Sequence, residues 1–411
     1  MIQPLLLLLL SILFSLAQCS EPTAERAETA AVNPPPAKAP ATATLPVAAI
    51  QTGADQTSTY LPFLKNKRVA MVVNQTSMIG SKHLVDSLVA AKVNITLIFA
   101  PEHGFRGDAD AGAHISNATD SKTGLPIFSL YGKNKKPSAE QLQNVDVLLF
   151  DIQDVGARFY TYISTMHYVM EAAAENNKTV LILDRPNPTG YYVDGPVLNL
   201  KHQSFVGMHP IPIVHGLTVG ELAGMINGQK WLAGQRTCNL KVIPVKNYTH
   251  KSRYSLPVKP SPNLPNDLAI QVYPSICLFE GTNVSVGRGT ATPFQVMGSP
   301  FYKKKAYSFT PKSVPGATNP PHLNQVCYGY KLTEKDVQGK FSLAYLLDFY
   351  QNSTNQDKFF NNFFNTLAGN TELQEQIKAG KSETEIRASW EPALTAYKKM
   401  RKQYLLYPDF E

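Results

Sequence analysis

Several common signatures of enzyme chemistry are absent from this sequence. No GxGxxG or Walker pattern follows the first apolar run, so a dinucleotide or nucleoside triphosphate site is not indicated. The histidines show no HExxH motif or paired spacing, and no GxSxG motif occurs, which argues against a metal hydrolase and a serine hydrolase. We therefore expect no metal and no cofactor.

Cysteine is also scarce, with four in 411 residues. Cys19 lies near the N-terminus, and Cys238, Cys277 and Cys327 are far apart with no CxxC spacing. Three body cysteines allow at most one disulfide, so buried thiols are the simpler expectation.

Charge is not concentrated in any one part of the chain. The formal net charge is +8, but the lysine-rich runs at 133–136, 303–305 and 398–402 are spread along the sequence. No aromatic–basic alternation or nucleic-acid module accompanies them, so we expect no nucleic-acid partner. The mild basic excess weakly favours an anionic substrate.

The only long apolar run lies at the start of the chain, over residues 5–14, and is too short to span a bilayer. It is typical of a secretory signal, and Leu16–Cys19 resembles a lipoprotein box in which Cys19 is acylated. A simply cleaved signal is the alternative. Residues 20–50 are rich in Ala, Pro and Thr and predict a disordered tether. We expect an exported, periplasmic protein whose only membrane contact is this lipid anchor.

Beyond residue 50, apolar runs alternate with stretches of helical periodicity. The runs predict buried strands at Arg68–Asn74, Ile95–Ala100, Val145–Asp151, Thr179–Asp184 and Leu240–Val245. The stretches between them predict helices at His83–Lys92, from Ser138, at Thr165–Asn177 and at Thr218–Lys230. This order predicts an α/β fold, with a Rossmann-like, mostly parallel sheet over residues 51–255.

The composition changes near residue 255, where prolines become frequent. Residues 256–411 predict a smaller C-terminal α/β domain that closes a cleft with the sheet, a usual place for a small-molecule site. Its helices are expected at Leu343–Tyr350, Lys358–Gly369, Leu373–Gly380 and Ser382–Arg401, with the last interrupted at Trp390–Pro392.

Polar residues follow three of the predicted strands. The turns are Pro101–His103, Asp151–Asp154 and Asp184–Asn187. Because the carboxyl ends of parallel strands meet at one sheet edge, where ligands bind in open α/β sheets, we expect these turns to form a site. A glycine-rich loop, Phe279–Thr290, adds Glu280, Asn283 and Arg288 from the second domain.

These same motifs resemble the exo-β-N-acetylmuramidase family NamZ (DUF1343). The resemblance is carried in order by Pro101–Gly107, Asp151–Tyr162, Asp184–Pro188 and Phe279–Thr290. It covers about residues 50–411. It implies a Rossmann-like domain with a smaller C-terminal domain, and release of N-acetylmuramic acid from the non-reducing end of peptidoglycan fragments. The N-terminus looks like that of a Bacteroidetes-type lipoprotein member acting in cell-wall turnover.

Glycoside hydrolysis usually needs a proton donor and a second group on the anomeric side. Glu102 is the candidate acid, because apolar neighbours would favour its protonated form. The second group stays open among Asp154, Tyr160, Glu280, Asp151 and the N-acetyl group of the substrate itself.

Muramic acid carries a lactyl carboxylate, for which a guanidinium is a suitable partner. Arg158 and Arg288 are the best candidates, with Arg106 and His103 as further possibilities. The remaining substrate-binding candidates could bond hydroxyls or stack on the sugar; they are Asp151, Tyr162, Asn187, Tyr273 and Asn283. A non-catalytic, sugar-binding lipoprotein on the same fold is the alternative function.

Overall fold

The computed structural model describes residues 48–105 and 118–411. Cys19, the signal, most of the tether and Arg106 lie outside the described residues. Within the described part, no helix combines the length and apolar character needed to cross a membrane. Cys238, Cys277 and Cys327 are buried free thiols, as expected from their spacing.

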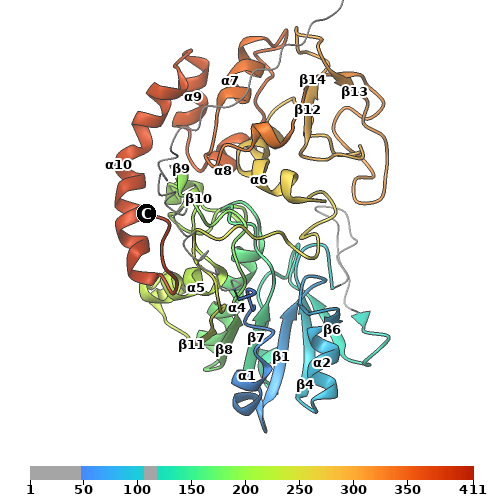
Figure 1. The fold of residues 1–411 in the computed structure, drawn as a ribbon, viewed down its shortest axis with the longest axis vertical. Helices are drawn as coiled ribbons and strands as arrows, with labels where there is room; N and C mark the ends of the chain where they lie inside the picture. The colour runs from blue at the N-terminus through green and yellow to red at the C-terminus, as the bar shows by residue number, and fades with distance from the viewer. Residues whose placement is uncertain (1–47, 106–117) are drawn as a thin grey trace, which may run out of the picture. The chain divides into compact units, whose positions relative to one another are not determined.

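A seven-stranded sheet forms the lower half of the molecule in Figure 1, in the order β11-β8-β7-β1-β4-β6-β5. Its strands are β1 (Arg68–Val73), β4 (Asn94–Ala100), β5 (Ala118–Thr119), β6 (Pro126–Ser129), β7 (Val147–Asp151), β8 (Thr179–Leu183) and β11 (Asn239–Ile243). All neighbours pair in parallel except β5 and β6. The predicted α/β, mostly parallel sheet is confirmed.

Alternation along each strand divides the core between two faces of the sheet. On β1, Val69 and Met71 join one hydrophobic cluster, while Ala70 and Val72 join the other. The helices around the sheet are α1 (Thr57–Leu64), α2 (Leu84–Ala90), α3 (Ala139–Leu142), α4 (Tyr162–Glu175) and α5 (Val219–Gly228). Buried side chains of α1 and α2 belong to the first cluster, and those of α4 and α5 to the second. The second cluster continues into the C-terminal part as far as Tyr397.

The C-terminal part lies at the carboxyl ends of the strands (Figure 1). It contains α6 (Asp267–Ile276), η3 (Cys277–Gly281), β12 (Val296–Ser299), β13 (Ser308–Phe309), β14 (Cys327–Lys331), η4 (Glu334–Asp336), α7 (Ala344–Gln351), α8 (Phe364–Ala368) and α9 (Glu372–Lys378). The three strands form an antiparallel sheet in the order β12-β14-β13. α8 is much shorter than the helix predicted at 358–369, because Phe359 and Asn361 instead bond to the loop at Gly281–Asn283.

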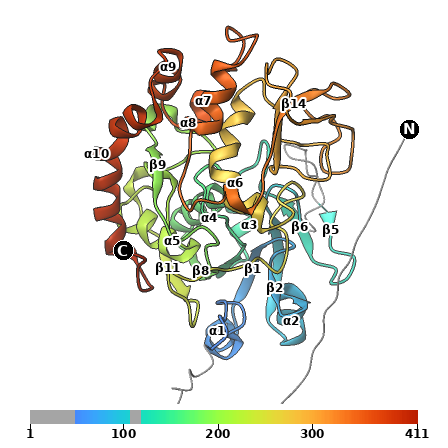
Figure 2. The same cartoon turned by 45° about the horizontal axis from the view of Figure 1, so that its top comes forward.

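Helix α10 (Glu383–Arg401) corrects the predicted interruption at Trp390–Pro392. It runs unbroken through Pro392, because its buried face of Ile386, Trp390, Leu394 and Tyr397 holds the helix against the core. The Tyr397 hydroxyl donates to the carbonyl of His215 at 2.6 Å. The helix thus joins the two halves along one side of the molecule, as Figure 2 shows.

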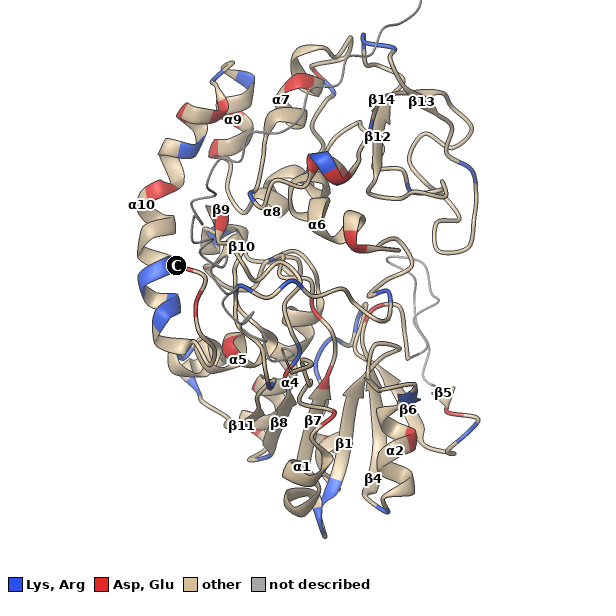
Figure 3. Cartoon of the chain, viewed as in Figure 1, with Lys and Arg blue, Asp and Glu red and all other residues tan. Residues whose placement is uncertain are grey.

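The remaining elements are short connections: β2 (Met78–Ile79), β3 (Lys82–His83), β9 (Asp194–Val197), β10 (Pro212–Val214), η1 (Leu200–His202), η2 (Ala233–Gln235) and η5 (Lys402–Tyr404). Figure 3 shows that charged residues are distributed over the whole fold. The last turn of α10 is a basic segment, with Lys398, Lys399 and Arg401, where cations are favoured by the helix dipole.

Candidate active site

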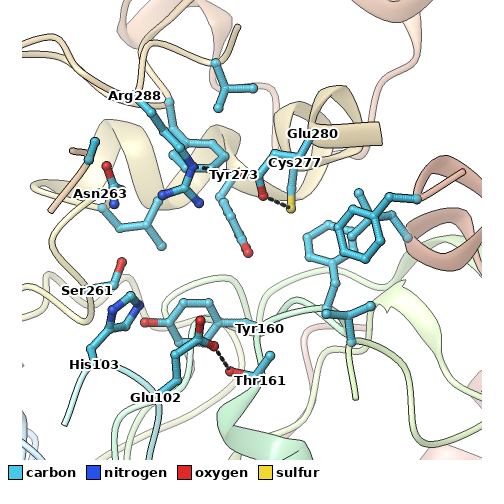
Figure 4. Close-up of a pocket in the computed structure, with 18 of the residues that line it drawn as sticks. Glu102, His103, Tyr160, Thr161, Ser261, Asn263, Tyr273, Cys277, Glu280 and Arg288 are labelled. Carbon is cyan, nitrogen blue, oxygen red and sulfur yellow. Dashed lines mark hydrogen bonds and ion pairs between the residues drawn. The ribbon is translucent and has the colours of Figure 1, made fainter. Parts of the chain in front are cut away.

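A cavity of about 820 Å³ lies where the strand ends of the sheet meet the C-terminal part. Figure 4 shows Glu102, His103, Tyr160 and Thr161 on one side, and Tyr273, Glu280 and Arg288 on the other. The size suits a small sugar, and the mixture of aromatic rings with a few charged groups is usual for ligand sites.

Glu102 is presented by a tight turn that ends β4. The amide of Gly104 donates to the carbonyl of Pro101 at 3.0 Å, which closes a four-residue turn around Glu102 and His103. His103 has a φ of 69°, a left-handed conformation that is uncommon for a residue with a side chain. Such conformations concentrate at functional sites, where the surrounding structure holds them.

The Glu102 carboxylate has two hydroxyl-bearing neighbours. The Thr161 hydroxyl donates to Oε2 at 2.7 Å, and the phenol of Tyr131 lies close enough for the carboxylate to raise its pKa. Burial raises the pKa of Tyr131, and the negative charge of Glu102 raises it further. Tyr131 therefore remains a neutral phenol at ordinary pH. Thr161 precedes α4, so the carboxylate also lies near the positive end of a helix dipole.

Three tyrosines form an edge-to-face cluster, in which Tyr273 comes from the wall opposite Tyr160. The Tyr160 ring centroid is 4.9 Å from that of Tyr162 and 5.9 Å from that of Tyr273. Tyr162 donates to the carbonyl of Pro260 at 3.1 Å, whereas the buried Tyr160 hydroxyl has no partner at hydrogen-bonding geometry among the described residues. Burial, with the neighbouring Tyr162, raises the pKa of Tyr160 well above its ordinary range. Tyr160 therefore keeps a neutral O–H group within the cavity wall.

On the opposite wall, Arg288 and Glu280 form an ion pair. Nε of Arg288 donates to Oε1 of Glu280 at 2.7 Å, and Sγ of Cys277 lies 3.5 Å from Oε2 (Figure 4). Both oxygens of Glu280 are thus directed to protein groups. Cys277 is a cavity thiol whose pKa is raised well above its ordinary range by burial and by Glu280.

Two predicted site aspartates are used inside the protein instead. Asp151 forms a fully buried ion pair with Arg185, 2.6 Å from Oδ1 to Nε, and does not line the cavity. Asp154 also lies outside it, where Oδ2 accepts from the amide of Gly156 at 2.7 Å and is 3.4 Å from Nε2 of His215. The sequence-based expectation was that these two carboxylates face the substrate. The structure instead places them against partners from neighbouring segments of the chain.

The two predicted asparagines also lie outside the cavity lining. Asn187 binds the carbonyl of Leu217 at 2.8 Å and accepts from the amide of Thr189, which holds a turn. Asn283 donates to the carbonyl of Lys358 at 3.2 Å. Their amides connect loops rather than face the cavity.

Arg158 is the largest correction. Its side chain is fully buried, and Nη1 and Nη2 donate to four backbone carbonyls at 2.8–3.0 Å; these belong to Pro196, Ile211, Leu367 and Ala368. Burial lowers the pKa of Arg158 to about 9, which still leaves it cationic at neutral pH. Its hydrogen bonds connect the sheet-containing part of the fold to the C-terminal part. Its side chain has no access to a ligand in the cavity.

Sequence reasoning missed several residues that line the cavity: Tyr131, Lys135, Thr161, Phe205, Ser261 and Asn263. Thr161 lies between Tyr160 and Tyr162, two predicted site residues, and a hydroxyl in that position could have indicated a further polar group in the site. Tyr131 follows β6, a four-residue strand too short to be recognised from an apolar run. Among the described residues, no three His, Cys, Asp or Glu side chains are grouped so as to hold a metal ion.

Sequence comparison places these features in a family. Models described as exo-β-N-acetylmuramidase NamZ, N-terminal and C-terminal, match residues 69–268 and 271–407. The chain belongs to the NamZ family. It is 41% identical over 388 residues to the peptidoglycan β-N-acetylmuramidase NamZ of Bacillus subtilis, which covers 87% of this chain and 91% of that relative.

Two solved structures of DUF1343 family proteins from Bacteroides fragilis support the same NamZ fold. The first is 51% identical with a TM-score of 0.82, and covers 88% of this chain and all of that one. The second is 30% identical with a TM-score of 0.75, and covers 87% of this chain and 99% of that one.

Proposed function

We propose that this NamZ-family chain is an exo-acting glycoside hydrolase. It releases N-acetylmuramic acid from the non-reducing end of peptidoglycan-derived glycans, with Glu102 as the proton donor. The observation that carries this proposal is the position of Glu102, which lines the cavity beside Tyr131 and is held by the Thr161 hydroxyl. Membership of the family supports the reaction and the substrate class.

The chemistry follows from the hydrogen bonds around Glu102. Its protonated form gives the proton to the glycosidic oxygen as the bond to the anomeric carbon breaks. The carboxylate that results is then stabilised by the Thr161 hydroxyl and by the positive end of α4. These interactions strengthen as charge develops, which is the condition for lowering the barrier.

The substrate's own acetamido oxygen is our proposed nucleophile at the anomeric carbon. Two features of the cavity support it: Glu280 directs both oxygens to protein groups, and the raised pKa of Tyr160 keeps its hydroxyl protonated. In the first step the acetamido oxygen bonds to the anomeric carbon while the leaving oxygen takes the proton of Glu102. In the second step water attacks the anomeric carbon, the bond to the acetamido oxygen breaks, and Glu102 takes a proton from the water. Replacing the acetyl group of the substrate by trifluoroacetyl makes the acetamido oxygen a weaker nucleophile and should slow turnover strongly. An unchanged rate would show that this oxygen is not the nucleophile.

Two disaccharides test the function. MurNAc-GlcNAc and GlcNAc-MurNAc are incubated separately with the protein and the products are identified by mass spectrometry. Free MurNAc from the first alone is expected. If neither is cleaved while MurNAc-GlcNAc binds, the chain is the non-catalytic sugar-binding protein instead.

We also propose that the protein is exported and lipid-anchored through Cys19. The apolar run at 5–14, the Leu16–Cys19 pattern and the Pro-rich residues 20–50 support this. Such a tether would let the cavity reach periplasmic glycan from a membrane anchor. Mass analysis of the mature N-terminus should find a diacylated Cys19, and Cys19→Ser should move the protein from the membrane to the soluble fraction. An unmodified N-terminus after Cys19 would indicate a simply cleaved signal.

A further inference from the structure

We propose that Arg288 recognises the free carboxylate of the substrate's lactyl group, and that Glu280 is the residue that positions it. This inference rests on the proposed function and names the group that makes the site selective for muramic acid. Of the two arginines that the sequence favoured, only Arg288 lines the cavity, since Arg158 is occupied by four carbonyls.

The backbone around Arg288 is built to hold one conformation. Gly287 and Gly289 flank it with φ values of 79° and 80°, in the left-handed region that favours glycine. A Cβ atom at Gly287 would lie 2.5 Å from Val296, and one at Gly289 would lie 2.4 Å from the carbonyl oxygen of Lys312. The turn that carries Arg288 therefore packs tightly on both sides, and its position does not depend on a ligand.

Glu280 fixes the orientation of the guanidinium on this turn. It accepts from Nε at 2.7 Å, while the guanidinium carbon lies 5.2 Å from the Phe294 ring centroid. Burial acts to lower the pKa of Arg288, but the charge of Glu280 and its hydrogen bond raise it, so the group stays charged. Nη1 and Nη2 make no hydrogen bond among the described residues and are not sealed from solvent. Figure 4 shows this end of the side chain directed into the cavity.

An anionic carboxylate fits these donors better than a neutral sugar group does. Nη1 and Nη2 form a fork whose parallel N–H bonds match the two oxygens of a carboxylate. A ligand without the carboxylate would leave the fork unpaired in a partly buried site, which is the strongest basis for discrimination. Among the residues that the structure describes, Lys135 is a rival cation in the cavity, but its ammonium lies over the Phe205 ring at 4.8 Å and presents a single point charge.

The test compares a chromogenic MurNAc glycoside with its lactyl methyl ester, in which a methyl group replaces the negative charge on one carboxylate oxygen. We expect wild-type kcat/KM to be roughly 100-fold higher for the free acid, as two charge-assisted hydrogen bonds allow. Arg288→Gln should reduce kcat/KM for the free acid to the value for the ester, and should leave kcat/KM for the ester within about 3-fold of wild type. Arg288→Lys should restore only part of the preference, because an ammonium cannot form the fork.

Glu280→Gln separates positioning from catalysis. A positioning role predicts a KM for the free acid raised by roughly 10-fold, with kcat and the ester kinetics little changed. The matched control is Arg236→Gln, since Arg236 forms an exposed pair with Glu175 at 3.7 Å outside the cavity. Thermal unfolding of each variant checks that it is folded.

Three outcomes would overturn the inference. In the first, Arg288→Gln lowers kcat/KM equally for the free acid and the ester and so keeps the preference. In the second, Lys135→Gln abolishes the preference instead. In the third, the wild-type protein shows no preference for the free acid. These outcomes leave the proposed function intact, because the wild-type protein still cleaves. A wild-type protein that cleaves neither glycoside overturns the function and the inference together.

Discussion

The hydroxyl of Thr161 donates a 2.7 Å hydrogen bond to Oε2 of Glu102, across 59 residues of sequence. Thr161 occupies the N-cap position of α4 but makes no side-chain capping bond to that helix. A threonine at this position usually satisfies a helix amide. Here its hydroxyl serves the cavity carboxylate instead, which links the start of α4 to the turn after β4.

Thr161→Val tests this link. The variant keeps the shape and removes the hydroxyl, and a hydrogen bond to a charged group is worth roughly 1.5–3 kcal/mol. We expect kcat to fall about 10- to 100-fold, with the melting temperature nearly unchanged because no helix cap is lost. Thr161→Ser should retain activity within about 3-fold. Equal losses in the valine and serine variants would show that the methyl group matters rather than the hydroxyl.

Tyr160→Phe should separate activity from stability. The Tyr160 hydroxyl is buried without a partner at hydrogen-bonding geometry in the described structure, so its removal should raise the free energy of unfolding by about 1 kcal/mol. The same change removes an O–H group from the wall of the cavity beside Glu102 and should lower kcat/KM by roughly 10-fold. Urea unfolding and steady-state kinetics measure the two effects. A variant that is less stable would indicate that the hydroxyl has a structural partner.

Arg158→Met should affect stability far more than activity. The change leaves four buried carbonyls without their donor, and breaking a buried charged interaction costs about 3–5 kcal/mol. We expect that loss in the free energy of unfolding, with kcat/KM of the folded protein within about 3-fold of wild type. A variant of normal stability with a large rise in KM would instead show that Arg158 binds the substrate.

Asp184 provides a pH-dependent test of the fold. Its carboxylate is buried beside Tyr407 and Thr218, and burial raises the pKa from 3.8 to about 6 despite their hydrogen bonds. A pKa above that of the unfolded chain means that stability from this group is present below pH 4 and is lost as pH rises through 6. The shift of about two units corresponds to roughly 3 kcal/mol.

The comparison is therefore between wild type and Asp184→Asn, which does not titrate at this position. The stability of wild type relative to the variant should fall by about 2.5 kcal/mol from pH 4 to pH 7. Guanidinium unfolding at several pH values measures this difference. A difference that is flat, or that grows with pH, would contradict the sign of the shift.

Much of the sheet could be predicted because its central strands are buried on both faces and read as continuous apolar runs. β1, β4, β7, β8 and β11 were all predicted within about two residues at either end. β6 has four residues and α6 contains Pro274, so neither carried a clear local signal. The core packing that stabilises α6 is not visible in its own sequence.

The site was only partly predictable, for a physical reason. Glu102 and Asp151 both end parallel strands and look alike in sequence. What distinguishes them is the group opposite: Arg185, from the end of a different strand, neutralises Asp151, while hydroxyl groups face Glu102. Arg158 looked like a ligand for a carboxylate, but the carbonyls that surround it lie 38 to 210 residues away, among them one in β9 and two at the end of α8. Such partners follow from the fold and not from local pattern.

The central claim is that Glu102 is the proton donor for glycosidic cleavage, and Glu102→Gln tests it most directly. The amide keeps the size and can still accept from Thr161, but it cannot give a proton. We predict that release of MurNAc from MurNAc-GlcNAc falls by roughly 1,000-fold or more, while calorimetry shows the disaccharide binding within about 5-fold of wild type. A Glu102→Gln protein that retains full turnover would contradict the account.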